Sequence, residues 1–297
     1  MARPCPGAPV PEPKDLKPPS FPDPQPDLTG AALSELTLSF WAKSGKSDPT
    51  TWLSVSQHLM DAADVAGLLF DHYLSEHHRR LLASVWDGDT SKARAALVFL
   101  AGVHDVGKIS LHFCCQHTGL AEFVRELGLP VPEKRDVQNR EHLPHGFASQ
   151  FALVEAVAAG GGEGERAAQW GVIVGVHHGR YPDSAVLGVA REAYEGGPGY
   201  RGREPRWHES RQEIIRWMAR RSGFPIENCA ETALPELPIS VAAAYSSVVV
   251  MADWLASNED YFPLRPQAGR ERELTADEQW ERVERGWGLA DMPRPMT

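Results

Sequence analysis

The sequence predicts a largely helical globular domain, and three of its segments support this prediction. From Trp52 to Tyr73, apolar residues recur at helical spacing, which indicates a helix with one buried face. Ala93 to Val106 is apolar on nearly every side, as expected of a central helix, and Ile239 to Ser257 is a second long apolar run. A chain of 297 residues can bury a sizeable core in one large domain or two small ones.

The composition is that of a soluble globular protein with an acidic balance. Apolar residues make up 42% of the chain and charged residues 24%, and the formal net charge is −10. Such a surface is not broadly cationic, so any nucleic-acid binding must depend on a local groove or on metal ions. We expect no membrane association, because the apolar run that ends at Ser257 contains Asp253, whose carboxylate would be costly in a bilayer.

The cysteines and the N-terminal segment indicate a reducing, cytoplasmic compartment. The four cysteines form no CxxC pair and no spacing typical of disulfides, and the N-terminal segment lacks the apolar core of a signal peptide. Residues 1–27 are rich in proline and poor in large apolar side chains, so they are expected to form a disordered arm.

After this arm, a helical pattern begins at Leu28. Leu33, Leu36, Phe40 and Trp41 are expected to line one face of this helix before the SGKSDP segment ends it.

The middle of the chain alternates polar connections with apolar segments. Pro130 to Leu143 is a polar connection, and the helix opened by His145 is expected to extend to Ala159. The pattern from Trp170 to Arg180 is compatible with either a strand or a helix. Tyr181 to Pro205 is rich in glycine and proline, which predicts a loop at the mouth of any site.

The C-terminal part contains a basic helix and a charged tail. Trp207 to Arg221 predicts an amphipathic helix with Ile214 and Met218 facing inward. Its outward side is the most plausible anion-contacting surface and is expected to carry Arg211, Arg216, Arg220 and Arg221. In the tail of residues 263–297, Trp280 and Trp287 are expected to dock onto something outside this chain.

Candidate metal ligands begin with the pair His104 and Asp105, in LVFLAGVHDVGKIS at the end of a buried segment. An imidazole beside a carboxylate offers a metal nitrogen and oxygen donors from one turn of backbone, a mixture that suits Zn, Mn, Fe, Co or Ni. An isolated pair of this kind is more often a hydrogen-bonded couple. The remainder of the chain must therefore decide between the two interpretations.

Further candidate ligands lie on, or beside, other apolar segments. His58 lies at the edge of a buried stripe, His145 opens a helix, and Asp253 lies in the long apolar run. The adjacent pair His177 and His178 point in different directions, which favours a centre with two metals or an extended substrate.

Together these residues offer about as many ligands as two metals roughly 3.5–4 Å apart require, an arrangement that suits phosphodiester hydrolysis. Asp105 is able to bridge the two metals. Lys108, one turn beyond His104, could contact a phosphate oxygen or the developing charge. Ser257, one turn after Asp253, could hydrogen-bond that carboxylate without binding the metal itself.

The order H…HD…D, with HDxGK at its second step, resembles the HD phosphohydrolase superfamily, whose fold is all-α. The LPHG, HHGRYP and ADWLASN segments, and the opening FWAKS followed by W…QHLMDAADVA, are similar to the HD nuclease domain of the CRISPR-associated helicase-nuclease of type I interference. The resemblance covers roughly residues 38–262. It implies an HD-domain helical bundle with a metal site between core helices.

The resemblance also implies a ligand set, a reaction and partners. One divalent transition metal would bind to His58, His104, Asp105 and Asp253, and a second to Asp105, His145, His177 and His178. Asp105 and Lys108 would be the catalytic residues. The family cuts single-stranded DNA beside a superfamily-two helicase and is recruited by an RNA-guided surveillance complex. This chain has no Walker A sequence, so we expect an HD nuclease domain at residues 28–262 and a tail or linker at 263–297 that leads toward a helicase in cis or trans.

Two other functions remain open at this stage. A cyclic-dinucleotide phosphodiesterase of the HD-GYP kind has a similar order of histidines, although HHGRYP lacks its spaced GYP triplet and FWAKS has no counterpart there. Alternatively, the chain is a non-catalytic helical docking module whose histidines merely close its core. Hydrolysis of cyclic dinucleotide against single-stranded DNA tests the first alternative, and metal content tests the second.

Overall fold

Helices form most of the fold in this computed structural model, which describes residues 32–45, 50–137, 140–179, 181–200, 202–230, 234–266 and 273–292. The arm predicted at residues 1–27 therefore lies outside the described residues. The helices are α1 (Glu35–Leu38), α2 (Val55–Leu68), α3 (Glu76–Ala83), α4 (Thr90–Val103), α5 (Leu111–Cys114), α6 (Thr118–Glu126), α7 (His145–Ala159), α8 (Gly164–Gly175), α9 (Ser184–Gly196), α10 (Arg206–Ser222), α11 (Ile239–Ala256) and α12 (Ala276–Ala290). The strands are β1 (Trp41–Ser44), β2 (Thr51–Ser54) and β3 (Arg265–Pro266).

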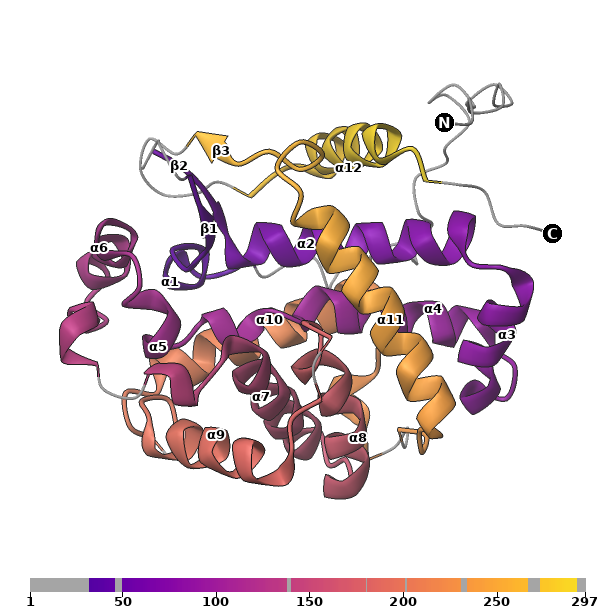
Figure 1. The fold of residues 1–297 in the computed structure, drawn as a ribbon, viewed down its shortest axis with the longest axis horizontal. Coiled ribbons are helices and arrows are strands. Elements are labelled where there is room, and N and C mark those ends of the chain that lie inside the picture. The colour runs from indigo at the N-terminus through magenta and orange to yellow at the C-terminus, as the bar shows by residue number, and fades with distance from the viewer. Residues whose placement is uncertain are drawn as a thin grey trace, which may run out of the picture.

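The core is built around α2 and α4, which pack side by side, and α11 crosses both of them (Figure 1). Every residue of α2 is buried, and the second half of α4 is buried on all sides, as the apolar pattern predicts. The helix pair α7 and α8 packs below them, and α10 lies against α4. The predicted all-α bundle is confirmed, with a small sheet at one edge.

This sheet replaces part of a predicted helix. The start of the helix predicted from Leu28 lies outside the described residues. From residue 32 onward the structure forms the single turn of α1, after which Trp41 lies in β1 rather than on a helix face. β1 pairs antiparallel with β2, which pairs with β3. Ser39 ends α1 as its C-cap, and the ring of Trp41 then packs on a partner distant in sequence, Phe113, with the ring centroids 4.4 Å apart.

Two expectations for the middle of the chain are decided by the structure. The segment left open between strand and helix contains the end of α8, and the predicted loop from Tyr181 contains α9 instead. Asp183 caps α9 by accepting a hydrogen bond from the backbone of Val186, and Tyr194 packs on Phe151 of α7. Most of the glycines and prolines that suggested a loop follow α9, although Pro182 precedes the helix and Gly188 lies within it.

The basic helix α10 forms as expected, but one of its arginines points inward. Arg211 is 2% exposed, and its guanidinium donates a hydrogen bond of 3.0 Å to the carbonyl of Ile109. The prediction that Arg211 faces solvent is wrong, because backbone carbonyls satisfy the buried charge. Arg221 is also paired, at 2.8 Å from the buried Asp64, whereas Arg216 is exposed.

The C-terminal helix α12 packs on α2 (Figure 1). Arg282 forms an ion pair of 2.9 Å with Asp61, and Gln279 donates hydrogen bonds to the same carboxylate and to that of Asp64. Trp280 and Trp287 pack against the core of this chain, so the expectation that they dock elsewhere is wrong. α12 belongs to the packed unit, because α2 presents buried carboxylates that its side chains neutralise. The domain boundary at residue 262 stays a prediction.

Among the described residues, α11 is the helix that is long and apolar enough to cross a membrane. Its inward side chains, including Val241, Tyr245 and Val249, lie in the core, and Asp253 lies near its C-terminal end. The length and hydropathy of α11 are therefore those of a core helix, which packs against α2, α4 and α8.

Candidate metal centre

The seven side chains predicted as ligands converge where α2, α4, α7, α8 and α11 meet. They form two groups, and within each group one potential ligand atom per residue lies within 4.8 Å of the others. The buried group consists of His58, His104, Asp105 and Asp253, and the open group consists of His145, His177 and His178.

The buried group surrounds one oxygen of each carboxylate. Asp105 Oδ2 lies 3.2 Å from His58 Nε2 and 3.5 Å from His104 Nε2. Asp253 Oδ1 lies 3.4 Å and 3.3 Å from the same two nitrogens. All four residues are buried, so this arrangement is closed by the core helices.

The open group approaches the other oxygen of the shared aspartate. Asp105 Oδ1 lies 3.2 Å from both His145 Nε2 and His177 Nε2. His178 Nε2 lies 2.8 Å from His145 Nε2, and His178 is exposed. The two oxygens of Asp105 therefore face one group each, which is the geometry that a bridging carboxylate requires.

Local backbone contacts orient two of the imidazoles. His104, the C-cap of α4, donates from Nδ1 to the carbonyl of Ala101 at 2.7 Å, and His177 donates from Nδ1 to Val174 at 2.6 Å in the turn after α8. A carbonyl oxygen only accepts, so Nδ1 carries a proton in both rings, and Nε2 points into the centre.

The glycine of the HDxGK turn brings α7 close to Asp105. A Cβ on Gly107 would lie 2.0 Å from the carbonyl oxygen of His145, so a larger residue would not fit there. The backbone of Gly107 donates a hydrogen bond of 2.8 Å to Ser149, whose hydroxyl donates one of 3.0 Å to His145. This contact fixes the first turn of α7, where His145 lies.

The donor set fits divalent transition metals. Buried polar atoms without a hydrogen-bond partner gather at this place: His58 Nε2, His104 Nε2, Asp105 Oδ1 and His177 Nε2. Buried polar atoms rarely remain unpaired in a native structure, because each carries a desolvation penalty. Imidazole nitrogens combined with carboxylate oxygens suit Mn, Fe, Co, Ni and Zn.

In the buried group, charges from neighbouring residues outweigh burial. Burial raises the pKa of Asp105, but the Lys108 ammonium and His104 hold it well below its usual range. Burial also opposes charge on Asp253, and His104 nevertheless lowers this pKa below its ordinary value. Burial lowers the pKa of His104, but Asp105 and Asp253 raise it above its usual value. Both carboxyl groups are therefore ionised at neutral pH.

In the open group, burial favours the neutral form of His145 and His178. Burial lowers the pKa of His145 to about 3. Burial, together with the neighbouring His177, also lowers the pKa of His178. Neutral imidazole is the form that binds a metal, so these two side chains are ready to act as ligands at neutral pH.

Lys108 and Ser257 contact the carboxylates directly. Lys108 Nζ lies 2.6 Å from Asp105 Oδ2 and donates a hydrogen bond of 3.2 Å to the carbonyl of Ala42. It is 7% exposed, so in this structure it contacts the aspartate rather than solvent. Ser257 donates a hydrogen bond of 2.8 Å to Asp253 Oδ1, which confirms the contact that the sequence suggested.

Lys43 of β1 was not among the predicted site residues, although its ammonium donates a hydrogen bond of 2.6 Å to the carbonyl of Ser257. Its position in FWAKS was the only signal. Two further histidines, His77 and His78, are exposed on α3 and belong to neither group of ligands.

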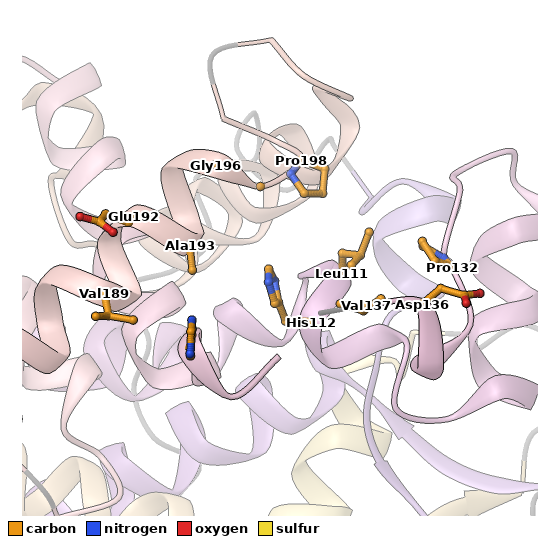
Figure 2. A pocket seen from close by; sticks show the side chains of 12 residues that line it. Leu111, His112, Pro132, Asp136, Val137, Val189, Glu192, Ala193, Gly196 and Pro198 are labelled. Carbon is orange, nitrogen blue, oxygen red and sulfur yellow. The ribbon is translucent and has the colours of Figure 1, made fainter. Parts of the chain in front are cut away.

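A separate pocket of about 690 Å³ lies between α5, the segment that precedes α7, and α9 (Figure 2). None of the predicted ligands lines this pocket. Its walls include Leu111, His112, Asp136, Val189 and Glu192. The unpaired donor atoms thus lie outside this hollow, at the junction of the core helices.

Comparison with known families settles the membership of the chain. Residues 41–262 match the model of the Cas3 HD domain. The chain belongs to this family. The match spans β1 to the end of α11 and therefore includes all seven converging side chains.

Related proteins are much longer than this chain. A CRISPR-associated nuclease/helicase Cas3 of Streptococcus thermophilus is 28% identical, over 76% of this chain and 25% of the relative. A CRISPR-associated endonuclease/helicase Cas3 of Thermus thermophilus is 29% identical, over 78% of this chain and 23% of the relative. The chain thus spans about a quarter of the length of these relatives.

The fold matches a solved Cas3 HD domain. The Thermus thermophilus domain, crystallised in the presence of Ni²⁺, superposes with a TM-score of 0.58 at 23% identity, covering 88% of this chain and 93% of that chain. At this identity the likeness establishes the fold, which agrees with the predicted HD-domain bundle.

Proposed function

We propose that this chain is a metal-dependent HD nuclease domain that hydrolyses phosphodiester bonds of single-stranded DNA in CRISPR type I interference. The observation that carries the proposal is Asp105, whose two oxygens face the buried group and the open group respectively. When bound, a pair of divalent ions would activate a water molecule and stabilise the charge on the leaving oxygen.

The residues of the chain would divide this work. His58, His104 and Asp253 would hold one ion and the open group the other, with Asp105 shared between them. Lys108 keeps Asp105 ionised and oriented through its contact of 2.6 Å. The exposed His178 marks the side from which a phosphodiester can approach, because the buried group is closed by core helices.

The ligand atoms indicate a class of metal ions rather than one metal. Nitrogen and oxygen ligands together favour Mn, Ni, Co, Fe or Zn over Mg or Ca, which prefer oxygen alone. The presence of Ni²⁺ in the crystals of the Thermus thermophilus domain supports this class. We propose that two such ions bind per chain.

Partners are proposed from the relatives and from one surface. The matched relatives are named as nuclease/helicases, which supports a superfamily-two helicase in cis or trans. An RNA-guided surveillance complex in the cytoplasm is the second proposed partner, and a solved structure of such a complex contains a chain with this fold. The outward side of α11 is uncharged and carries two large exposed apolar side chains, Ile239 at 89% and Trp254 at 69%, together with Ser240 and Ser247. Exposed apolar surface of this kind is typical of an interaction site, which supports a further domain beside α11.

The two alternatives are less well supported. Membership in the Cas3 HD family, with the match beginning at the WAKS strand, favours the nuclease over a cyclic-dinucleotide phosphodiesterase. A docking module has no need for unpaired donors that all point to one place, because buried polar atoms lower stability unless something binds them.

Metal content and cleavage together test the proposal. The purified chain should contain close to two transition-metal ions by elemental analysis, or bind them after treatment with chelator. With added Mn²⁺ or Ni²⁺ it should cleave single-stranded DNA and leave a cyclic dinucleotide intact. A chain that binds no metal supports the docking module, whereas faster hydrolysis of the cyclic dinucleotide supports the phosphodiesterase.

A further inference from the structure

Strand β1 contacts both sides of the buried group through two consecutive residues. The carbonyl of Ala42 accepts a hydrogen bond of 3.2 Å from Lys108, and the same ammonium lies 2.6 Å from Asp105. The next residue, Lys43, donates a hydrogen bond of 2.6 Å to the carbonyl of Ser257. The strand therefore links the segments that carry the two carboxylates.

Ser257 is tied to Asp253 by two contacts of its own. Its backbone donates a hydrogen bond of 2.7 Å to the carbonyl of Asp253, and its hydroxyl donates one of 2.8 Å to Asp253 Oδ1. As the C-cap of α11, Ser257 sets the last turn of that helix. A cation on its carbonyl also interacts favourably with the negative end of the helix dipole.

The backbone of β1 is irregular at this point. The register of β1 against β2 shifts between Trp41 and Lys43, as in a β-bulge. A bulge re-aims the side chains on either side of it, and such irregularities are frequent next to active sites. Here Trp41 packs into a small apolar cluster with Trp52 and Phe113, while Lys43 reaches the end of α11.

We propose that Lys43 is a positioning residue of the metal centre, which holds Asp253 in place through Ser257. This inference rests on the proposed function, because it assigns Lys43 a role toward the ion of the buried group. Partners that orient metal ligands from outside typically change metal affinity by about 10–100-fold when they are removed. The hydrogen bonds of Ser257 lead to Asp253 and Lys43, neither of which belongs to the open group, so the affinity of the open group for its ion should not change.

The experiment compares Lys43→Met and Lys43→Arg with the unchanged chain. Lys92→Met is the matched control, because Lys92 is exposed on the first turn of α4. Each protein is stripped with chelator and titrated with Mn²⁺ in a calorimeter. Lys43→Met should bind one of two ions about 10–100-fold more weakly. Lys43→Arg, which retains a cationic donor, should recover most of this affinity, and Lys92→Met should match the unchanged chain.

A second readout separates positioning from folding. The metal-free melting temperature of Lys43→Met should lie within about 4 °C of the unchanged chain, since one hydrogen bond is lost. The rise in melting temperature on adding Mn²⁺ should be smaller. If Lys43→Met fails to fold, Ser257→Ala, which removes the bond to Asp253 Oδ1, should show the same selective weakening.

The outcomes distinguish this inference from the proposed function. An unchanged chain that binds no Mn²⁺ overturns the proposed function itself. An unchanged chain that binds two ions, with Lys43→Met binding both equally well, overturns only the role of Lys43. Equal weakening of both ions also contradicts it, because Lys43 would then act on the fold as a whole.

Discussion

The buried group and the open group share Asp105, but they are held by different parts of the fold. Around the buried group, α2, α4 and α11 pack on every side, and each of its four residues is buried. The open group lies at the first residue of α7 and in the turn after α8, with His178 exposed. One group is thus enclosed by the core, while the other starts from the buried His177 and reaches the surface at His178.

This difference indicates that the buried group is rigid, whereas the open group is accessible to solvent and substrate. Ligands within a close-packed core have few alternative positions, so the buried group is preorganised and should release its ion slowly. Ligands at helix ends retain some freedom and contact with solvent, so the open group should exchange its ion and admit a substrate. Substitutions should therefore have unequal effects on the two groups.

The largest effect should come from Asp105→Asn, which breaks the link between the groups. It removes the negative charge that both oxygens share, and stabilisation of several kcal/mol in the transition state corresponds to a loss of roughly 10³-fold or more in cleavage of single-stranded DNA. Metal content should fall at both groups. His77→Ala and His208→Ala are the controls and should retain full activity; comparable damage in all three would refute the ligand assignment.

A smaller, unequal effect should separate His58→Ala from His178→Ala. Loss of the exposed imidazole leaves Asp105, His145 and His177 for the ion, so binding should weaken by about 10–100-fold and recover at higher Mn²⁺. Loss of His58 leaves His104, Asp105 and Asp253 in a close-packed core that cannot rearrange to replace the lost donor, so added Mn²⁺ should not restore cleavage. Metal titrations of the cleavage rate measure this contrast. Identical Mn²⁺ dependence in the two variants would show that the groups are equivalent.

A third effect should reach only the buried group, through α12. Asp61 is fully buried on α2, the helix of His58, and Arg282 of α12 neutralises it. Arg282→Ala leaves a buried charge unpaired, which should lower the free energy of unfolding in urea by about 3–5 kcal/mol. Affinity for one of two ions should fall as well. Arg80→Ala, an exposed arginine of α3, is the control. If Arg282→Ala kept the stability of the unchanged chain, α12 would be a linker that the fold does not need.

The sequence pattern predicted the features that depend on neighbouring residues in the chain. Helical spacing located α2, α4 and α11, and the order of histidines and aspartates named all seven converging side chains. These features depend on which residues follow one another, and a buried histidine beside an apolar stripe is visible in the sequence.

Features set by distant partners were missed. Trp41 lies in a strand, where its ring packs on Phe113, which is distant in sequence. Arg211 points inward because its guanidinium donates a hydrogen bond to the carbonyl of Ile109. Trp280 and Trp287 cover the core of their own chain. Charge or aromaticity alone does not reveal such partners, since the same side chain would serve equally well at a surface.

The smallest effect concerns the charge of Lys43 beside the buried group. Burial, together with the nearby Lys108, lowers the pKa of Lys43 from 10.5 to about 8. Between these two values the unfolded chain keeps a proton that the folded chain has lost, so the stability of the metal-free protein should rise with pH across this range. Lys43→Met lacks this contribution. Both proteins are unfolded in urea with chelator at intervals from pH 7.5 to about 10.5. The free energy of unfolding of the unchanged chain should rise with pH relative to that of Lys43→Met. Parallel curves would place the ammonium in open solvent, where it could not hold the end of α11.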